Sequence, residues 1–88
     1  IIPKRHIVDY FTLTEVEKRH ADRLIQILRK RILDNDTTVT GFNIGINSGE
    51  SAGQTIFHCH IHLIPRREGD TPNPRGGVRG VIPEKMGY

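Results

Sequence analysis

A chain of 88 residues with 35% hydrophobic residues and no tryptophan has room for one modest domain, whose thin core a partner subunit would help to bury. Its formal net charge of +3 suits an anionic ligand, but long basic runs and aromatic platforms are missing, so we expect no nucleic-acid partner. The single cysteine excludes an intrachain disulfide framework and favours a reducing, cytoplasmic location, and no membrane-spanning stretch or signal peptide is visible.

The N-terminal segment begins inside an apolar run, Ile1-Ile2-Pro3, and continues into a basic cluster that ends with His6. This pattern is typical of the end of a strand followed by a turn. Since the run has no starting methionine, we expect that residues precede Ile1.

A helix is predicted to begin at Thr14, because residues 14–17 (Thr-Glu-Val-Glu) have the form of a capping box. The Asp-Asn-Asp cluster at residues 34–36 is predicted to end it. Apolar side chains recur along one face at helical spacing: Ala21, Leu24, Ile25, Leu28 and Ile32. We expect a charged helix that covers a sheet and carries no chemistry.

Two strands are predicted next, at residues 39–47 and at Thr55–Pro65, separated by a small polar loop. The loop is too short for a parallel crossover, so the strands should form an antiparallel hairpin. In the first strand, one face would carry Asn43, Gly45 and Asn47. Pairing would place this face beside the most unusual feature of the sequence, a row of histidines.

The histidine row consists of His58, His60 and His62, three of the five histidines in the chain. On a strand these side chains would share one face, while Cys59 and Ile61 would face the core. Imidazole can act as nucleophile, acid, base or metal ligand near neutral pH. The row is therefore the candidate functional site.

Three interpretations of the row stand beside one another. The first is the solvated face of an edge strand. The second is a metal site, although His58 and His62 would lie about 13 Å apart along an extended strand and converge on one ion only with difficulty. The third is covalent catalysis on phosphorus, in which one imidazole attacks and its neighbours hold oxygens and move protons. The loop before the row supports the third, because its hydroxyl, amide and backbone donors suit a phosphate: Ser51, Gly53, Gln54 and Thr55.

The last segment, residues 66–88, holds five of the nine glycines, three of the five prolines and four arginines. Such a composition buries little apolar surface. We therefore divide the chain into a core of residues 1–65 and an extended C-terminal arm of residues 66–88. Its arginines would either approach the phosphates of a substrate or belong to a solvated tail that only supports dimer packing.

Residues 52–66, Ala-Gly-Gln-Thr-Ile-Phe-His-Cys-His-Ile-His-Leu-Ile-Pro-Arg, resemble the signature of the histidine triad (HIT) family of nucleotide hydrolases and transferases. The segments at residues 2–6 and 42–47 resemble the family's neighbouring strands. The arm resembles a bacterial branch related to diadenosine polyphosphate hydrolases.

The resemblance implies a role for each matching residue. His60 would be the nucleophile that takes the nucleoside α-phosphate, His62 would contact phosphate and assist the leaving group, and His58 would orient the nucleophile. The remaining positions implied to bind phosphate or nucleotide are His6, Asn47, Gln54 and Thr55. A histidine at the third triad position favours hydrolysis over transfer.

The same resemblance implies an α+β fold, in which an antiparallel sheet is covered by a helix and the first strands lie upstream of Ile1. It implies a homodimer and a triad without metal, with Mg²⁺ only as the companion of a polyphosphate substrate. The expected function is hydrolysis at the α-phosphate of a dinucleoside polyphosphate through a nucleotidyl-histidine intermediate. A nucleoside phosphoramidase and a nucleotide-binding module with little turnover remain alternatives.

Overall fold

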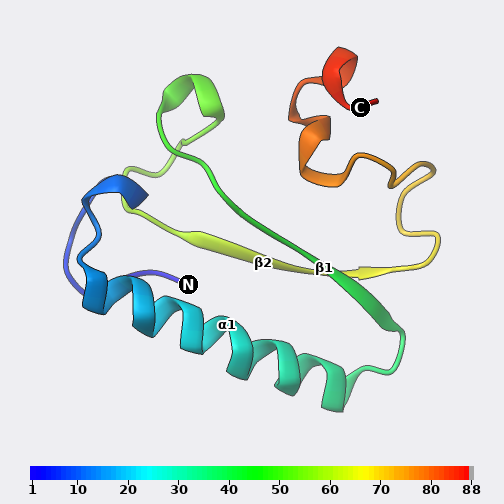
Figure 1. The fold of residues 1–88 in the computed structure, drawn as a ribbon, viewed down its shortest axis with the longest axis horizontal. Coiled ribbons are helices and arrows are strands. Elements are labelled where there is room, and N and C mark those ends of the chain that lie inside the picture. The colour runs from blue at the N-terminus through cyan, green and yellow to red at the C-terminus, as the bar shows by residue number, and fades with distance from the viewer. Residues whose placement is uncertain (88) are drawn as a thin grey trace.

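The computed structural model describes residues 1–87 and contains one long helix and one antiparallel hairpin (Figure 1). The α+β class predicted from the sequence is confirmed. In chain order the elements are η1 (Tyr10–Thr12), α1 (Glu15–Asn35), β1 (Val39–Ile46), η2 (Glu50–Ala52), β2 (Ile61–Arg67), η3 (Gly77–Val81) and η4 (Pro83–Lys85), where η marks a short 3-10 helix. Among residues 1–87, no helix combines the length and the apolar character that crossing a membrane requires.

Helix α1 begins where the capping box predicted. The Thr14 hydroxyl accepts a hydrogen bond from the backbone N–H of Glu17 at 3.1 Å, and the Glu17 carboxylate accepts one from the backbone N–H of Thr14 at 2.8 Å. Two donors that a helix start leaves without partners are thereby satisfied. At the other end Asp36 is the C-cap, and its N–H donates to the carbonyl of Ile32 at 2.9 Å.

The apolar face of α1 is only partly covered. Most of its predicted core positions are half-buried, but Leu24 is 42% exposed. A sheet of two strands is too narrow to cover the apolar stripe of a long helix.

Strands β1 and β2 pair antiparallel, as predicted. Gly45 lies opposite His62, and Asn43 lies opposite Ile64, so the polar face of β1 does adjoin the histidine face of β2. A register shift between Val39 and Gly41 interrupts the ladder at its far end.

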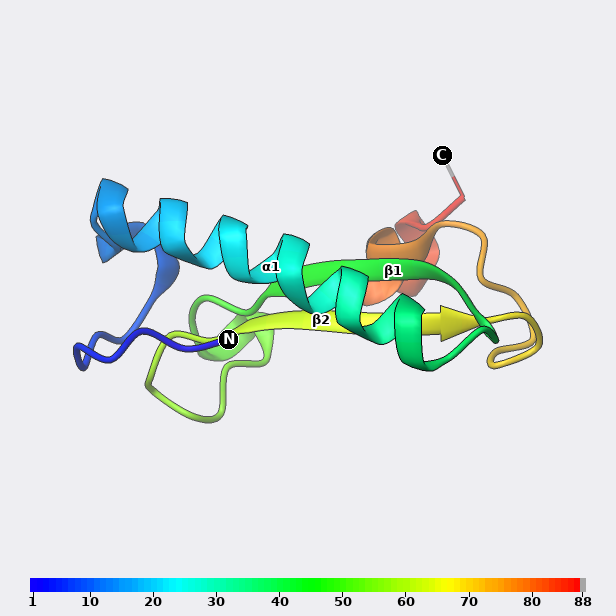
Figure 2. The ribbon, with the colours of Figure 1, turned by 90° about the horizontal axis from the view of Figure 1, so that it is seen from below.

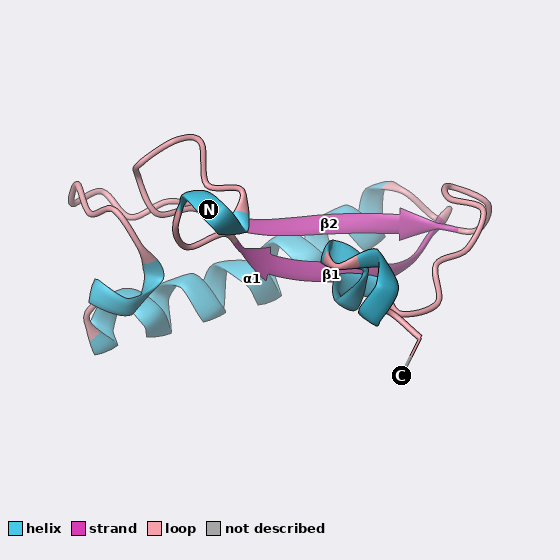
Figure 3. Cartoon of the chain, turned by 90° about the horizontal axis from the view of Figure 1, so that it is seen from above, coloured by secondary structure: helices cyan, strands magenta, loops and turns pink. Residues whose placement is uncertain are grey.

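The predicted bounds of the histidine strand were wrong. Strand β2 begins at Ile61 instead of Thr55 and continues to Arg67 instead of ending at Pro65. Residues 55–60 do not join the ladder with β1, because their neighbour is the N-terminal segment: the N–H of Cys59 donates to the carbonyl of Ile7 at 2.8 Å. His62 therefore lies in the strand, while His58 and His60 lie in the loop that leads to it. Figure 3 shows β2 with the loop that precedes it.

The N-terminal segment runs along the side of β2 that faces away from β1. Ile1 and Ile61 exchange hydrogen bonds in both directions, with N···O distances of 2.8 and 2.9 Å. Ile7, Leu13 and Cys59 then form the small buried core, against which Tyr10 packs. The loop that carries the first two triad histidines is thus held between the N-terminal segment and the hairpin.

Helix α1 and the C-terminal arm lie on opposite sides of the hairpin (Figures 1 and 2). Residues 77–85 of the arm are wound into η3 and η4, so this part is not extended as expected. Gly76 permits the fold-back with a φ of 97°, and a Cβ added there would lie 2.7 Å from the carbonyl oxygen of Met86. The division between core and arm stays a prediction.

Candidate active site

Four histidines gather at the start of β2. The rings of His60 and His62 meet edge to face with centroids 4.8 Å apart, and those of His6 and His58 do so at 5.1 Å. His60 and His62 meet across the junction of loop and strand, and the N-terminal segment places His6 against His58. His20, on α1, is the fifth histidine and lies outside this group.

A backbone hydrogen bond orients the ring of His60. Its Nδ1 lies 2.9 Å from the carbonyl oxygen of His58. A carbonyl oxygen only accepts hydrogen bonds, so Nδ1 must be the protonated nitrogen of the neutral ring. Nε2 then keeps its lone pair, which is the state that a nucleophile or a base requires.

His58 is itself held by the N-terminal segment. Its Nε2 lies 3.1 Å from the carbonyl oxygen of Pro3, so Nε2 carries the proton in the neutral ring. The contact between His58 and the ring of His60 is made by the backbone oxygen of His58, while the imidazole of His58 is held against Pro3. Pro3 was not predicted as part of the site, because it contributes a backbone carbonyl, which leaves no signal in the side-chain pattern of the sequence.

The loop of residues 47–55 turns on two glycines. Gly49 and Gly53 adopt φ values of 94° and 91°, a region that other residues rarely occupy. Asn47 is half-buried beside this turn, since its Nδ2 would lie 3.9 Å from a Cβ added at Gly53. Thr55 is exposed where the loop leads into the triad.

Gln54 occupies a position that differs from the expected one. Its side chain is 2% exposed, and its amide Nε2 donates to the carbonyls of Val8 and Ile56 at 2.7 and 3.2 Å. Its Oε1 accepts from the N–H of Gly49 at 2.9 Å. The amide is therefore used inside the protein to shape the loop, and it is not presented to a phosphate as we had expected.

The face of the hairpin beside His62 is open. Gly45 lies opposite His62, and a Cβ added at Gly45 would meet nothing within 4 Å. The absence of a side chain here leaves space over the hairpin on the face that carries His62.

Arg66 and Arg67, at the far end of the hairpin, are engaged within the chain. Arg66 forms a two-point ion pair with Asp70 at 2.7 and 2.8 Å, and Arg67 contacts Asp36 at 2.6 Å. Hydrogen bonds from Arg67 and Thr38 lower the pKa of Asp36 to about 2, and Arg66 holds the pKa of Asp70 well below its usual range. These arginines tie the hairpin to its flanking turns, a role that the composition of the arm did not reveal.

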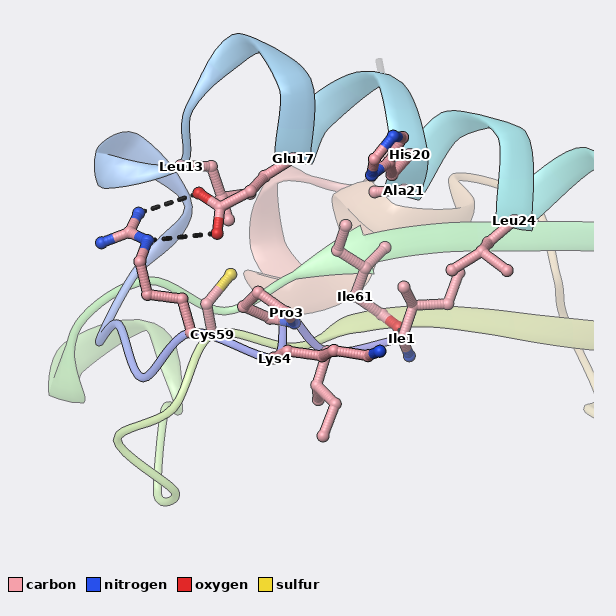
Figure 4. A pocket seen from close by; sticks show the side chains of 12 residues that line it. Ile1, Pro3, Lys4, Leu13, Glu17, His20, Ala21, Leu24, Cys59 and Ile61 are labelled. Atoms are coloured by element: carbon pink, nitrogen blue, oxygen red, sulfur yellow. Dashed lines mark hydrogen bonds and ion pairs between the residues drawn. The ribbon is translucent and has the colours of Figure 1, made fainter.

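A separate cavity of about 520 Å³ lies between α1 and the N-terminal segment (Figure 4). Its lining is largely apolar and includes Ala21, Leu24, Cys59 and Ile61. The Arg5–Glu17 ion pair, at 2.8 Å, lines the same cavity, and the hydrogen bond from Arg5 lowers the pKa of Glu17 to about 2. Burial raises the pKa of the Cys59 thiol, which is therefore held in its neutral form.

Metal ligands do not cluster in the described part of the chain. Within residues 1–87, no three side chains of histidine, cysteine, aspartate or glutamate gather closely enough to hold an ion together. The arrangement instead offers one oriented imidazole with a second imidazole beside it and space above the strand. Such a pair can attack a phosphorus centre and transfer a proton.

Known proteins share this arrangement of sequence and fold. The HIT domain model matches residues 1–69. Protein hit of Bacillus subtilis is 35% identical over 66 residues, which are 75% of this chain and 45% of that protein. The AP-4-A phosphorylase of Mycobacterium tuberculosis is 34% identical over 73 residues, which are 80% of this chain and 36% of that protein.

A solved structure is also similar. The zinc-bound histidine triad family protein from Mycobacterium smegmatis has a TM-score of 0.70 at 35% identity, covering 82% of this chain and 52% of that one. The chain thus spans less than half the length of the two curated relatives. With a family match over most of its residues and the triad at the junction of loop and strand, the chain belongs to the histidine triad family.

Proposed function

We propose that this chain is the catalytic part of a nucleotide hydrolase that acts at the α-phosphate of a dinucleoside polyphosphate through a nucleotidyl-His60 intermediate. The observation that carries the proposal is the hydrogen bond between His60 Nδ1 and the carbonyl of His58 at 2.9 Å. It fixes the tautomer that leaves Nε2 unprotonated, with His62 beside it.

The proposed reaction has two steps. His60 Nε2 attacks the α-phosphorus, a phosphorus–nitrogen bond forms, and the bond to the bridging oxygen breaks. The leaving polyphosphate takes a proton from His62. Water then attacks the same phosphorus, gives its proton back to His62 and releases a nucleoside monophosphate, which returns His60 to its starting state.

Phosphate oxygens would bind around this centre. In the proposal, His6 contributes a second imidazole from the N-terminal segment, and Asn47 and Thr55 contribute an amide and a hydroxyl from the glycine-rich loop. Gln54 holds that loop from within. A Mg²⁺ ion would arrive only with the polyphosphate chain of the substrate. The lone, buried Cys59 suits the proposed cytoplasmic setting.

The molecule that attacks the proposed nucleotidyl-His60 intermediate decides between two reactions: water gives hydrolysis, and inorganic phosphate gives phosphorolysis. One relative is named an AP-4-A phosphorylase and another, from Arabidopsis thaliana, is named an adenylylsulfatase, so related chains are described with different substrates and acceptors. We propose that water is the acceptor in this chain, because His62 can take a proton from it.

Product analysis tests this proposal. The full-length protein would be incubated with diadenosine tetraphosphate, with and without inorganic phosphate, and with adenosine phosphoramidate. Hydrolysis yields AMP and ATP in both mixtures, whereas phosphorolysis yields ADP and ATP when phosphate is present. Cleavage of the phosphoramidate alone would support a nucleoside phosphoramidase instead, and tight nucleotide binding without turnover would support a binding module.

A further inference from the structure

The C-terminal arm contacts the hairpin on the face that carries His62. A Cβ added at Gly77, in η3, would lie 3.5 Å from Nδ2 of Asn43, and Asn43 shares its face of β1 with Gly45. The Oδ1 of Asn43 accepts a hydrogen bond from Arg66 of β2. One side chain thus joins both strands and lies against the arm.

This contact brings the arm close to the triad. Asn43 is two residues from Gly45, which lies opposite His62, so the arm reaches the strand about 7 Å along β1 from that point. The loop around η2 rises on the same side of the hairpin, away from α1 (Figure 1). The open strand at Gly45 therefore lies between the glycine-rich loop and the arm.

Three of the four arginines in residues 66–88 form hydrogen bonds or ion pairs through their side chains. Arg66 binds Asp70 and Arg67 binds Asp36, while Nε of Arg79 donates to the carbonyl of Gly76 at 3.2 Å. Arg75 is exposed, and within residues 1–87 its guanidinium makes no hydrogen bond or ion pair. It lies two residues before Gly77, where the arm meets Asn43.

We infer that Arg75 binds the phosphates beyond the α-phosphate and thereby selects substrates with a polyphosphate chain, an inference that rests on the proposed function. A guanidinium presents paired N–H donors that match two phosphate oxygens, and it stays charged at every physiological pH. When the α-phosphate is at His60 over the open strand, the remaining phosphates of the substrate would extend toward either the glycine-rich loop or the C-terminal arm. Of these two segments, the arm is the one that carries an arginine, Arg75, whose guanidinium makes no hydrogen bond or ion pair among residues 1–87.

Calorimetric binding of AMP and of ATP to the full-length protein tests this inference. AMP fills only the α-phosphate position, whereas ATP adds two further phosphates. Arg75→Gln is expected to weaken ATP binding about tenfold and to leave AMP binding unchanged, because one charge-assisted contact is lost. Lys85→Gln is the matched control, since it removes one exposed positive charge from η4 of the same arm and should change neither.

Two results would overturn the inference. Equal weakening of both nucleotides would make Arg75 a support of the site as a whole, and an unchanged ATP affinity would leave it without a ligand role. The proposed function is checked separately by the wild-type protein: if it binds AMP and cleaves diadenosine tetraphosphate while Arg75→Gln has no selective effect, only the inference about the arm fails.

Discussion

The position of the proton on the His60 ring is determined by the contacts of that ring within the protein. The neutral ring of His60 would exchange between two tautomers in water, but the carbonyl of His58 accepts only from a protonated Nδ1. The selection depends on the position of the His58 backbone, which the contact of its imidazole with Pro3 in turn supports. A segment far away in sequence thus helps to determine which nitrogen of His60 keeps its lone pair.

His60→Ala is expected to reduce turnover by about four orders of magnitude while nucleotide binding survives, because the reacting atom is removed and the rest of the site remains. Rapid acid quenching of the wild-type protein, followed by mass analysis, should find one nucleotidyl group on His60. His20→Ala is the matched control, since His20 lies on α1, and it should keep full activity. Near-normal turnover by His60→Ala would exclude the covalent mechanism.

Gln54→Ala is expected to lower the free energy of unfolding by about 2 kcal/mol, because it leaves the N–H of Gly49 and two carbonyls, all partly buried, without their partner. Urea unfolding measures the change. Gln26→Ala, on the exposed surface of α1, is the control and should alter the value little. If stability is unchanged and nucleotide affinity falls instead, Gln54 contacts the ligand as the sequence first suggested.

The sequence predicted helix and strand signals that act within a few residues, but it did not predict which distant segments pair with one another. The capping box placed the start of α1, because its residues interact within one turn. The histidine row alternates through Phe57–Leu63, yet the ladder with β1 begins only at Ile61. Alternation describes an extended backbone and does not say which neighbour it pairs with. The same limit hid the burial of Gln54, because one of its partners, the carbonyl of Val8, is distant in the sequence.

Two ion pairs, Arg67–Asp36 and Arg5–Glu17, contribute stability that depends on pH. The pKa values of Asp36 and Glu17 are lowered to about 2, chiefly by hydrogen bonds from Arg67 and Arg5. As pH falls, the unfolded chain binds protons at these carboxylates before the folded chain does. The stabilisation is therefore fully present above the ordinary carboxyl pKa and is lost as pH falls toward about 2.

Asp36→Asn is expected to flatten the dependence of the urea midpoint on pH between about pH 5 and about pH 2. The variant cannot lose a proton at this position in either state, so that part of the linkage disappears. Asp22→Asn removes a carboxylate that makes no hydrogen bond or ion pair among the described residues, and it should leave the slope as it is. An identical slope for wild type and Asp36→Asn would show that the pair with Arg67 does not form in solution.

The molecule as a whole has more apolar surface than its own elements cover. Phe11 is 77% exposed, Leu24 lies uncovered on the apolar face of α1, and Ile44 of β1 is 50% exposed. Within the described residues β1 pairs with β2 alone, so its other edge is open. Open edges and apolar patches are the features by which a chain associates with a copy of itself.

We predict that the full-length protein is a homodimer in which β1 takes part, as the family resemblance implies. Sedimentation at micromolar concentration should give twice the chain mass. Ile44→Lys should shift the equilibrium toward monomer, because a charge would replace half-exposed apolar surface on the strand with the open edge. Ile56→Lys makes the same change at a residue that is 65% exposed in the loop before the triad, and it should leave the dimer intact. A monomer at every concentration would contradict the prediction, and a dimer that resists Ile44→Lys but dissociates with Ile56→Lys would move the interface to the loop beside the triad.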